Sequence, residues 1–293
     1  MTAIDNYTTY IEGMQKSLED KLFWVPIIEQ NCEILKDEKI DGIVDFGCAD
    51  GTLLKQVKHD LYYASDYRQK DINLIGVDNN NKMLDRALSN CPTMQAVGSL
   101  DEVEVKENYL LNLSSVIHEV YSYCSDEEIE DFWNHVFNDN YKYIAIRDMM
   151  VDRSVNLVNP IVVERQDGIH LLRKEYWNKY YNNIHEFDTK QWKNFLVHSG
   201  YDADECNWNV ENKDVLHFLM KYRYIENWER EVRENYFPIY YEDLLNKIIE
   251  NGNYEIVYAR QYILPYVKEK VKEDFDIDLV DNTHCQILLK WID

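Results

Sequence analysis

The first half of the chain alternates short apolar runs with segments of helical spacing. The apolar runs predict β-strands near 42–46, 73–77, 94–97, 109–114 and 142–147. Helices are predicted between these strands, near 52–60, 80–89 and 126–138. Strands that alternate with helices form parallel sheets with helices packed on their faces. The pattern therefore predicts an α/β fold.

The alternation breaks after Asp148 and resumes near the end of the chain. Strands are predicted there near 254–259 and 284–291, with helices at 241–252 and 265–275. Segment 152–237 reads as a mainly helical, aromatic-rich insertion, with helical periodicity around 190–198 and 215–234. Alternatively, 188–200 is a helix of the main fold, which would move the boundary of the insertion.

The first residues of the chain carry a stripe of large apolar side chains at helical spacing. The stripe consists of Tyr7, Tyr10, Ile11, Met14 and Leu18. It predicts a helix over 3–29, which either covers a ligand or only packs on the core. The predicted domains are an N-terminal helical cover (1–40), a core (41–151 and 238–293) and an insertion (152–237) that acts as a substrate lid.

Composition narrows the classes of function. The 293 residues carry a formal net charge of −23, which disfavours binding to nucleic acid. No apolar stretch is long enough for a membrane span, and the first residues lack the layout of a signal peptide. The six cysteines form no C-x-x-C pair, so we expect reduced thiols, a cytoplasmic protein and no metal site.

A glycine-containing turn follows the first predicted strand. Its pattern is Asp45-x-Gly47-x-Ala49-x-Gly51. Glycine adopts positive φ and has no Cβ that would keep a ligand from the backbone. The next strand also ends in an acid, Asp78, whose carboxylate can accept hydrogen bonds from both hydroxyls of a ribose. Two such strand ends side by side predict a nucleoside-binding crevice.

These motifs and their spacing resemble those of the class I S-adenosylmethionine-dependent methyltransferases, with Ala49 replacing the usual middle glycine. The resemblance implies a doubly wound, seven-stranded, mostly parallel sheet whose last strand is antiparallel and enters between its predecessors. It also implies S-adenosylmethionine as cofactor, with Asp78 on the ribose, Asn79 along the adenine edge and Met83 facing the base. The residues assigned to the cofactor site are Asp45, Gly47, Cys48, Ala49, Gly51, Asp78, Asn79, Met83, Ser99, Leu100 and Ser114.

An NAD-dependent enzyme is the nearest competing interpretation of the glycine turn. It is disfavoured because the turn lacks the third glycine that packs helix against strand in dinucleotide-binding folds.

The end of the fourth predicted strand holds the best candidate for catalysis. Ser114, Ser115, His118 and Glu119 follow an apolar run that resembles the family's fourth-strand motif, so we expect them at the crevice. His118 is a candidate general base because its unperturbed pKa lies near neutrality. The alternative is that His118 only packs or caps at the start of a helix.

Arg147 and Asp148, at the end of the fifth predicted strand, are the other predicted catalytic residues. Arg147 could bind a carboxylate or phosphate of the acceptor while Asp148 orients it. A structural ion pair between the strand end and a neighbouring loop is an equally good interpretation.

The sequence thus predicts a methyltransferase that acts on an oxygen or nitrogen of a small or medium-sized acceptor. Methylation of RNA, with the insertion as reader, is one alternative. Basic and aromatic residues alternate there around 221–233, although glutamates are mixed among them. A non-catalytic module that binds S-adenosylmethionine is the other alternative. Acceptor identity and oligomeric state are left open.

Overall fold

The computed structural model divides the chain into two compact units. The residues that the structure describes are 17–30, 40–63, 72–157, 161–164, 187–202, 207–224, 227–275 and 278–292. One unit, called the core unit below, comprises residues 13–148, 246–260 and 286–293. The second unit comprises residues 1–12, 149–245 and 261–285. The grouping of 261–285 with the second unit was not predicted from the sequence.

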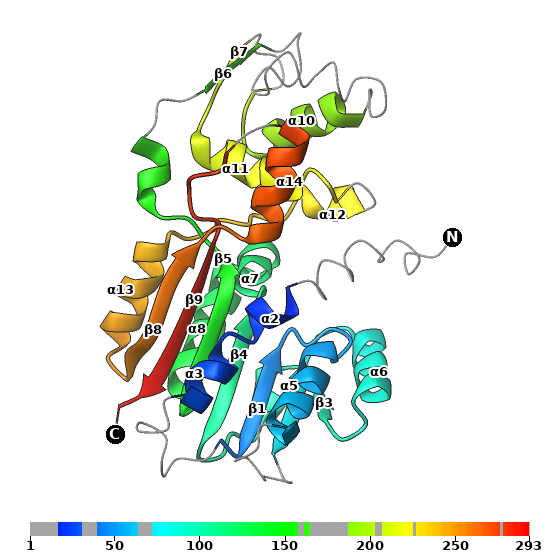
Figure 1. The fold of residues 1–293 in the computed structure, drawn as a ribbon, viewed down its shortest axis with the longest axis vertical. Helices are drawn as coiled ribbons and strands as arrows, with labels where there is room; N and C mark the ends of the chain where they lie inside the picture. Colours follow the sequence, from blue (N-terminus) through cyan, green and yellow to red (C-terminus); the bar gives the residue numbers. More distant parts are fainter. Residues whose placement is uncertain are drawn as a thin grey trace. The chain divides into compact units, whose positions relative to one another are not determined.

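A seven-stranded sheet with the order β3-β2-β1-β4-β5-β9-β8 organises the fold (Figure 1). Its strands are β1 (Gly42–Phe46), β2 (Asn73–Val77), β3 (Gln95–Val97), β4 (Tyr109–Ser114), β5 (Tyr143–Met149), β8 (Tyr254–Tyr262) and β9 (His284–Trp291). The strands from β3 to β5 pair in parallel. β9 runs opposite to them and enters between β5 and β8 (Figure 1). The fold class and the late, inserted antiparallel strand are therefore confirmed.

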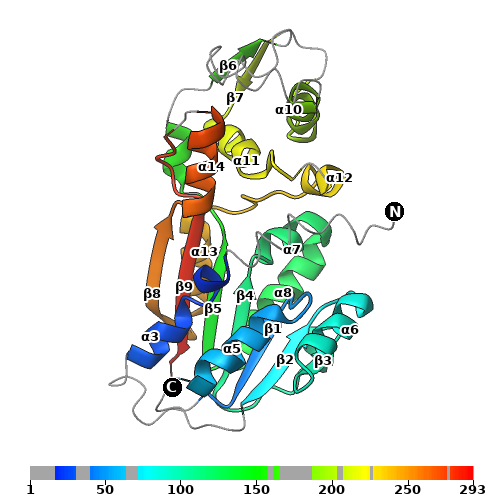
Figure 2. The same ribbon diagram turned by 45° about the vertical axis from the view of Figure 1, so that its right-hand side comes forward.

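Helices pack on both faces of this sheet (Figures 1 and 2). They are α2 (Leu18–Lys21), α3 (Trp24–Gln30), α5 (Thr52–Tyr63), α6 (Asn81–Asn90), α7 (Ile117–Tyr123), α8 (Asp126–Asn138) and α13 (Tyr241–Asn251), with a short 3₁₀ turn η2 (Leu100–Glu102). On one face, Trp24, Leu54 and Ala87 of α3, α5 and α6 share a core with Ile43 and Leu110 of the sheet.

The opposite face of the sheet is covered by α8, whose apolar stripe is aromatic. The ring of Phe132 lies 5.4 Å from that of Phe46 in β1. Trp133 stacks on Phe137 at 5.3 Å. The helix begins with a capping box, in which Ser125 and Glu128 satisfy each other's backbone N–H groups. The two apolar faces, each covered by helices, account for the buried strands read from the sequence.

The single helix predicted over 3–29 is wrong within the described residues, because the chain breaks between α2 and α3. Leu22 leaves the helical conformation with φ −95° and ψ 19°. Pro26 has no N–H to bond to the carbonyl of Leu22, so an unbroken helix would lose a hydrogen bond there. The N–H of Val25 bonds to the Leu22 carbonyl instead, at 3.0 Å. The apolar stripe before Leu18 lies outside the described residues.

The second unit contains helices and a two-stranded antiparallel sheet. Its elements include η3 (Arg153–Leu157), β6 (Ile161–Glu164), α10 (Phe187–His198), β7 (Asn207–Val210), α11 (Asn212–Lys221), α12 (Trp228–Glu231) and α14 (Pro265–Phe275). β6 and β7 pair from Ile161↔Val210 to Glu164↔Asn207. The prediction of a mainly helical insertion missed this sheet, although the β-branched run of β6 favours a strand.

Aromatic side chains form much of the core of the second unit. Trp192 and Phe195 of α10 stack at 5.9 Å, and Phe218 of α11 meets Trp192 edge-on at 4.7 Å. Lys221 is buried among them and donates hydrogen bonds to the carbonyls of Glu231 and Glu234, at 2.6 and 2.5 Å. Many of the aromatic side chains of this segment therefore belong to its core.

Among the described residues, no helix is long and apolar enough to cross a membrane.

Candidate functional site

The turn after β1 is hydrogen-bonded to the end of β2. The N–H groups of Gly47 and Cys48 both donate to the carbonyl of Val77, at 2.8 and 3.0 Å. Gly47 and Gly51 have φ of 77° and 73°, and Ala49 between them has φ of 46°. The turn therefore uses the left-handed conformations that glycine tolerates best. Ala49 adopts one without being a glycine, in agreement with its place in the family's glycine pattern.

Tight packing is a second reason for the small residues of this turn. A Cβ on Gly51 would lie 3.0 Å from the Cβ of Ala87 in α6. Beneath the turn, Cys48 packs on Gly76 of β2, where an added Cβ would lie 2.7 Å from the Cys48 sulfur. Burial raises the pKa of the Cys48 thiol well above its usual value, so this thiol is a packing group.

Asp78 connects the end of β2 to this turn. One oxygen of its carboxylate accepts the N–H of Ala49 at 3.1 Å, and the other accepts the N–H of Asn80 at 2.8 Å. The side chain of Asn80 then caps α6. Asn79 is exposed, and Met83 is half-buried in the first turn of that helix.

The end of β3 contributes two more of the predicted residues. The N–H of Asp78 donates to the carbonyl of Val97, the last residue of β3, at 3.2 Å. Ser99 follows half-buried, and Leu100 is buried at the start of η2. The predicted cofactor residues of β1, β2 and β3 thus lie at the carboxyl ends of three adjacent parallel strands.

Asp45 belongs to a buried chain of hydrogen bonds that begins in α3. In the register of β1 and β4, Asp45 lies opposite Asn112. The Asn112 amide donates to the Asp45 carboxylate at 2.7 Å, and its oxygen accepts the indole N–H of Trp24 at 3.1 Å. Burial raises the pKa of Asp45 to about 6, against the opposing effects of the Asn112 hydrogen bond and the charge of Lys21.

Arg147 at the end of β5 is bound by groups of the core unit. Its Nε and Nη2 lie 2.7 and 2.6 Å from one carboxylate oxygen of Asp20 in α2. Its Nη1 donates to the hydroxyl of Ser115 at 2.7 Å. Asp20 also accepts hydrogen bonds from Gln286 of β9. Arg147 thus forms an ion pair with a helix, where the sequence suggested a neighbouring loop, and its role toward an acceptor stays a prediction.

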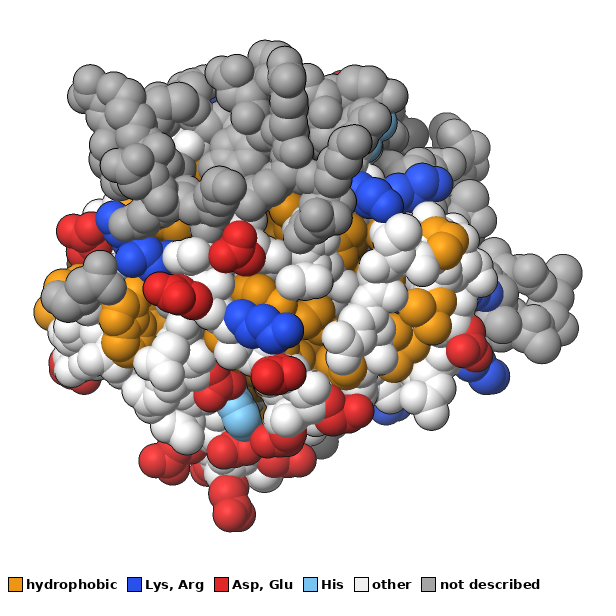
Figure 3. Space-filling view, turned by 90° about the horizontal axis from the view of Figure 1, so that it is seen from below, with side chains coloured by type: hydrophobic (Ala, Val, Ile, Leu, Met, Phe, Trp, Pro, Cys, Tyr) orange, Lys and Arg blue, Asp and Glu red, His pale blue; other side chains and the backbone are white. Residues whose placement is uncertain are grey.

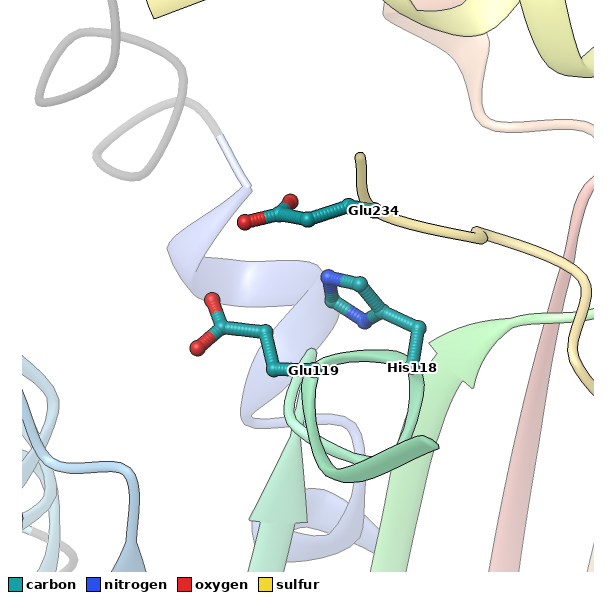
Figure 4. Close-up of side chains that lie close together, drawn as sticks. All are labelled: His118, Glu119 and Glu234. Atoms are coloured by element: carbon teal, nitrogen blue, oxygen red, sulfur yellow. The ribbon is translucent and has the colours of Figure 1, made fainter. Parts of the chain in front are cut away.

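Asp148 holds the start of α7 together with His118. One of its oxygens accepts the N–H groups of Val116 and Ile117, at 2.9 and 2.6 Å. The other lies 2.8 Å from Nδ1 of His118. Figure 4 shows His118 and Glu119 on α7. The positive end of the helix dipole favours a carboxylate at this position.

Arg147 and Asp148 bond to different elements, and the expectation that Asp148 orients Arg147 stays a prediction. Successive residues of a strand point to opposite faces of the sheet. Arg147 therefore reaches Asp20, whereas Asp148 reaches the backbone of α7 and His118.

Two polar groups at this edge have no bonding partner among the described residues. The hydroxyl of Ser114, the last residue of β4, is buried without a hydrogen bond. Lys21 of α2 is buried, and its ammonium group makes no hydrogen bond or ion pair with any described residue. Burial is the largest of the causes that lower the Lys21 pKa to about 8.

Sequence reasoning missed several residues of this edge: Asp20, Lys21, Trp24 and Asn112. Asn112 left a signal, since it is the one polar residue in the apolar run from Leu110 to Leu113. The other three lie in the leading segment, where no motif distinguishes them.

Comparison with known proteins gives matches in structure alone. No protein-family profile matches the sequence, and no curated protein sequence matches it. The plantazolicin methyltransferase BamL, solved in complex with a triazolic desmethylPZN analog and SAH, aligns with a TM-score of 0.50 at 8% identity. The alignment covers 97% of this chain and 89% of BamL.

Other solved methyltransferases align less closely. Magnesium protoporphyrin IX methyltransferase from Synechocystis PCC 6803 has a TM-score of 0.43 at 10% identity, over 96% of this chain and 84% of its own. An S-adenosylmethionine-dependent methyltransferase from Mesorhizobium loti has a TM-score of 0.43 at 13% identity, over 88% and 95%. Strand order, the inserted antiparallel strand and the likeness to BamL together show that the chain has the fold of the class I S-adenosylmethionine-dependent methyltransferases.

Proposed function

We propose that this protein is an S-adenosylmethionine-dependent methyltransferase that methylates an oxygen or nitrogen of a small or medium-sized acceptor. The observation that carries the proposal is the meeting of the Asp45–Gly51 turn with the Asp78 carboxylate at the carboxyl ends of β1 and β2. Open α/β sheets bind their ligands at this edge. The structural likeness to BamL, a methyltransferase solved with SAH, agrees with this assignment.

The residues at this edge fit the cofactor. Each oxygen of the Asp78 carboxylate accepts a backbone hydrogen bond, and a carboxylate oxygen has a further lone pair for a ribose hydroxyl. Gly47 is exposed and lets a ligand approach the backbone of the turn. The buried hydroxyl of Ser114 lacks a partner among the described residues, and a bound ligand would supply one.

Bound S-adenosylmethionine supplies an activated methyl group, so the protein mainly has to align the acceptor and remove its proton. His118 and Asp148 are suited to the second task. When Nδ1–H of His118 donates to Asp148, Nε2 carries the lone pair of a base. Asp148 is itself held by the backbone N–H groups of α7, so the imidazole has a defined orientation.

Cofactor binding is the first test of the proposal. We expect S-adenosylmethionine and S-adenosylhomocysteine to bind the wild-type protein in isothermal titration calorimetry. Asp78→Ala should weaken both by roughly a hundredfold or more, because it removes charge-assisted hydrogen bonds to the ribose. Asp85→Ala, a change at an exposed position of α6, is the matched control. Failure of the wild-type protein to bind either compound would refute the proposed function.

The role of His118 is tested by separating binding from turnover. His118→Ala should bind S-adenosylmethionine like the wild type. It should form S-adenosylhomocysteine about 10²- to 10⁴-fold more slowly with an accepted hydroxyl or amine compound. An unchanged rate for the variant would rule out His118 as the base.

A further inference from the structure

Lys21 has a buried ammonium group with no hydrogen-bond or ion-pair partner among the described residues. Its side chain is 8% exposed, and no described residue bonds to its ammonium group. A lysine ammonium has three hydrogens to donate, and a buried charge without a partner is strongly unfavourable. A lysine in this state is suited to an anionic group of a ligand.

The neighbours of Lys21 in sequence hold it at the carboxyl ends of the central strands. Asp20, the preceding residue, forms the ion pair with Arg147 at the end of β5. Trp24, three residues later, donates to Asn112 of β4. Lys21 therefore lies in the chain between two residues that are anchored to β5 and β4.

Charged groups of three further elements act on the Lys21 ammonium. Asp45 at the end of β1, Asp148 at the end of β5 and Glu119 on α7 all favour its protonated form, whereas Arg147 opposes it. None of the three acids bonds to the ammonium directly. The cation therefore stays charged near neutral pH and retains its hydrogens for a ligand.

Ser114 lies on the same face of β4 as Asn112, because the two residues are two positions apart. Its hydroxyl is the other buried group at this edge without a partner among the described residues. Among the described residues, Asp45 accepts a side-chain hydrogen bond from Asn112 alone, through the carboxylate oxygen Oδ1. A cation, a hydroxyl and a carboxylate with a free oxygen are together complementary to the zwitterionic end of an amino acid.

The strand order indicates which ligand group would lie at this position. Asp78 ends β2, on one side of β1, and Ser114 ends β4, on the other side. A ligand whose ribose lies on Asp78 and whose middle crosses the β1 turn therefore has its far end at β4. In S-adenosylmethionine, that far end is the amino-acid moiety.

Building on the proposed function, we propose that Lys21 binds the carboxylate of the amino-acid end of S-adenosylmethionine. Segment 17–30 is then part of the cofactor site, and Lys21 is a binding residue that the sequence motifs do not include.

The first experiment uses the wild-type protein and two ligands. Decarboxylated S-adenosylmethionine keeps the nucleoside, the sulfonium and the ammonium group, and lacks only the carboxylate. Calorimetry should show that it binds roughly 10- to 100-fold more weakly than S-adenosylmethionine. Equal affinities would overturn the assignment of Lys21 and leave the proposed function standing. Failure of both ligands to bind would refute both.

The second experiment shows whether Lys21 is the group that senses the carboxylate. Lys21→Met should bind S-adenosylmethionine more weakly by the same factor, and should bind the decarboxylated ligand as the wild type does. Lys55→Met, at an exposed position of α5, should change neither affinity. An equal loss for both ligands would mean a purely structural role and overturn the inference. If Lys21→Met does not fold, the comparison of ligands on the wild-type protein decides.

Discussion

At the scale of single residues, the candidate site is built from charges that the protein keeps out of water. Asp45 is 3% exposed and has the Asn112 amide as its hydrogen-bond donor. Burial disfavours its charged form, which is why its pKa rises to about 6. Asp148, in contrast, accepts hydrogen bonds from two backbone N–H groups at the start of α7. Two buried acids of one sheet edge thus have different environments.

The raised pKa of Asp45 predicts how stability depends on pH. The value in the folded protein, about 6, lies above the ordinary 3.8, so the folded state binds more protons than the unfolded state between these pH values. The contribution of Asp45 to stability therefore falls as the pH rises from about 4 to about 6. An asparagine at this position does not titrate, so the stability of the Asp45→Asn variant should not fall with pH for this reason.

Urea denaturation at a series of pH values measures this effect. The free energy of unfolding of Asp45→Asn, relative to wild type, should rise by about 2–3 kcal/mol between pH 4 and pH 7. Asp85→Asn controls for the loss of one exposed negative charge. A relative stability that falls with pH would instead mean that the ionised Asp45 stabilises the fold.

At the scale of elements, the short leading helices are held to the sheet by polar side chains. Trp24 is fully buried in the core unit, and its indole N–H donates to Asn112 of β4. Asp20 adds ion-pair contacts to β5, and Gln286 of β9 bonds to Asp20 in turn. These bonds set where Lys21 lies, so the packing of α2 and α3 is coupled to the candidate cofactor site.

We therefore expect Trp24→Phe to destabilise the protein by about 2–4 kcal/mol, because it leaves the Asn112 oxygen buried without a donor and also removes ring volume. Trp133→Phe is a matched control. The indole N–H of Trp133 donates to the hydroxyl of Tyr121 at 3.0 Å, and this hydrogen bond is only partly buried. Trp133→Phe should therefore lower the free energy of unfolding by less than Trp24→Phe does. Chemical denaturation of the two variants gives the comparison. Equal losses would mean that the Trp24 hydrogen bond contributes little.

At the scale of the whole molecule, charge is the dominant property. The formal net charge is −23 at pH 7. Acidic side chains gather along one edge of the face drawn in Figure 3. Nucleic acid binding depends on neutralising phosphates with lysine and arginine, so such a surface disfavours RNA as a partner. This property supports the proposal of a small or medium-sized acceptor.

The charge predicts the outcome of a binding experiment with RNA. A fluorescein-labelled single-stranded RNA of mixed sequence should show no change in anisotropy with the protein, even at low salt. Binding that weakens steeply as salt is raised would contradict this expectation and favour methylation of RNA. S-adenosylhomocysteine should be added in a parallel titration, so that an RNA site that needs the cofactor is not missed.

Much of the fold was predictable from the sequence because its signals are local. Each central strand is a contiguous apolar run, as in Leu110–Leu113, and buried parallel strands need such runs. The turn from Asp45 to Gly51 was recognisable since positive φ favours glycine, and Gly47 and Gly51 both adopt it. The residues at the ends of β1 and β2 therefore followed from short stretches of sequence.

Other features depend on residues far apart in the chain. Arg147 is paired with Asp20 across 127 positions, and Gln286 bonds to Asp20 across 266. No periodicity or motif encodes such pairs, because they form only when separate elements pack together. The sequence by itself determined the strands of the seven-stranded sheet, the turn and the fold class, whose physical causes act between neighbouring residues. Only the tertiary structure decided that Asp148 holds His118 and that the buried charge of Lys21 has no partner among the described residues, since desolvation and long-range contacts exist only in the folded chain.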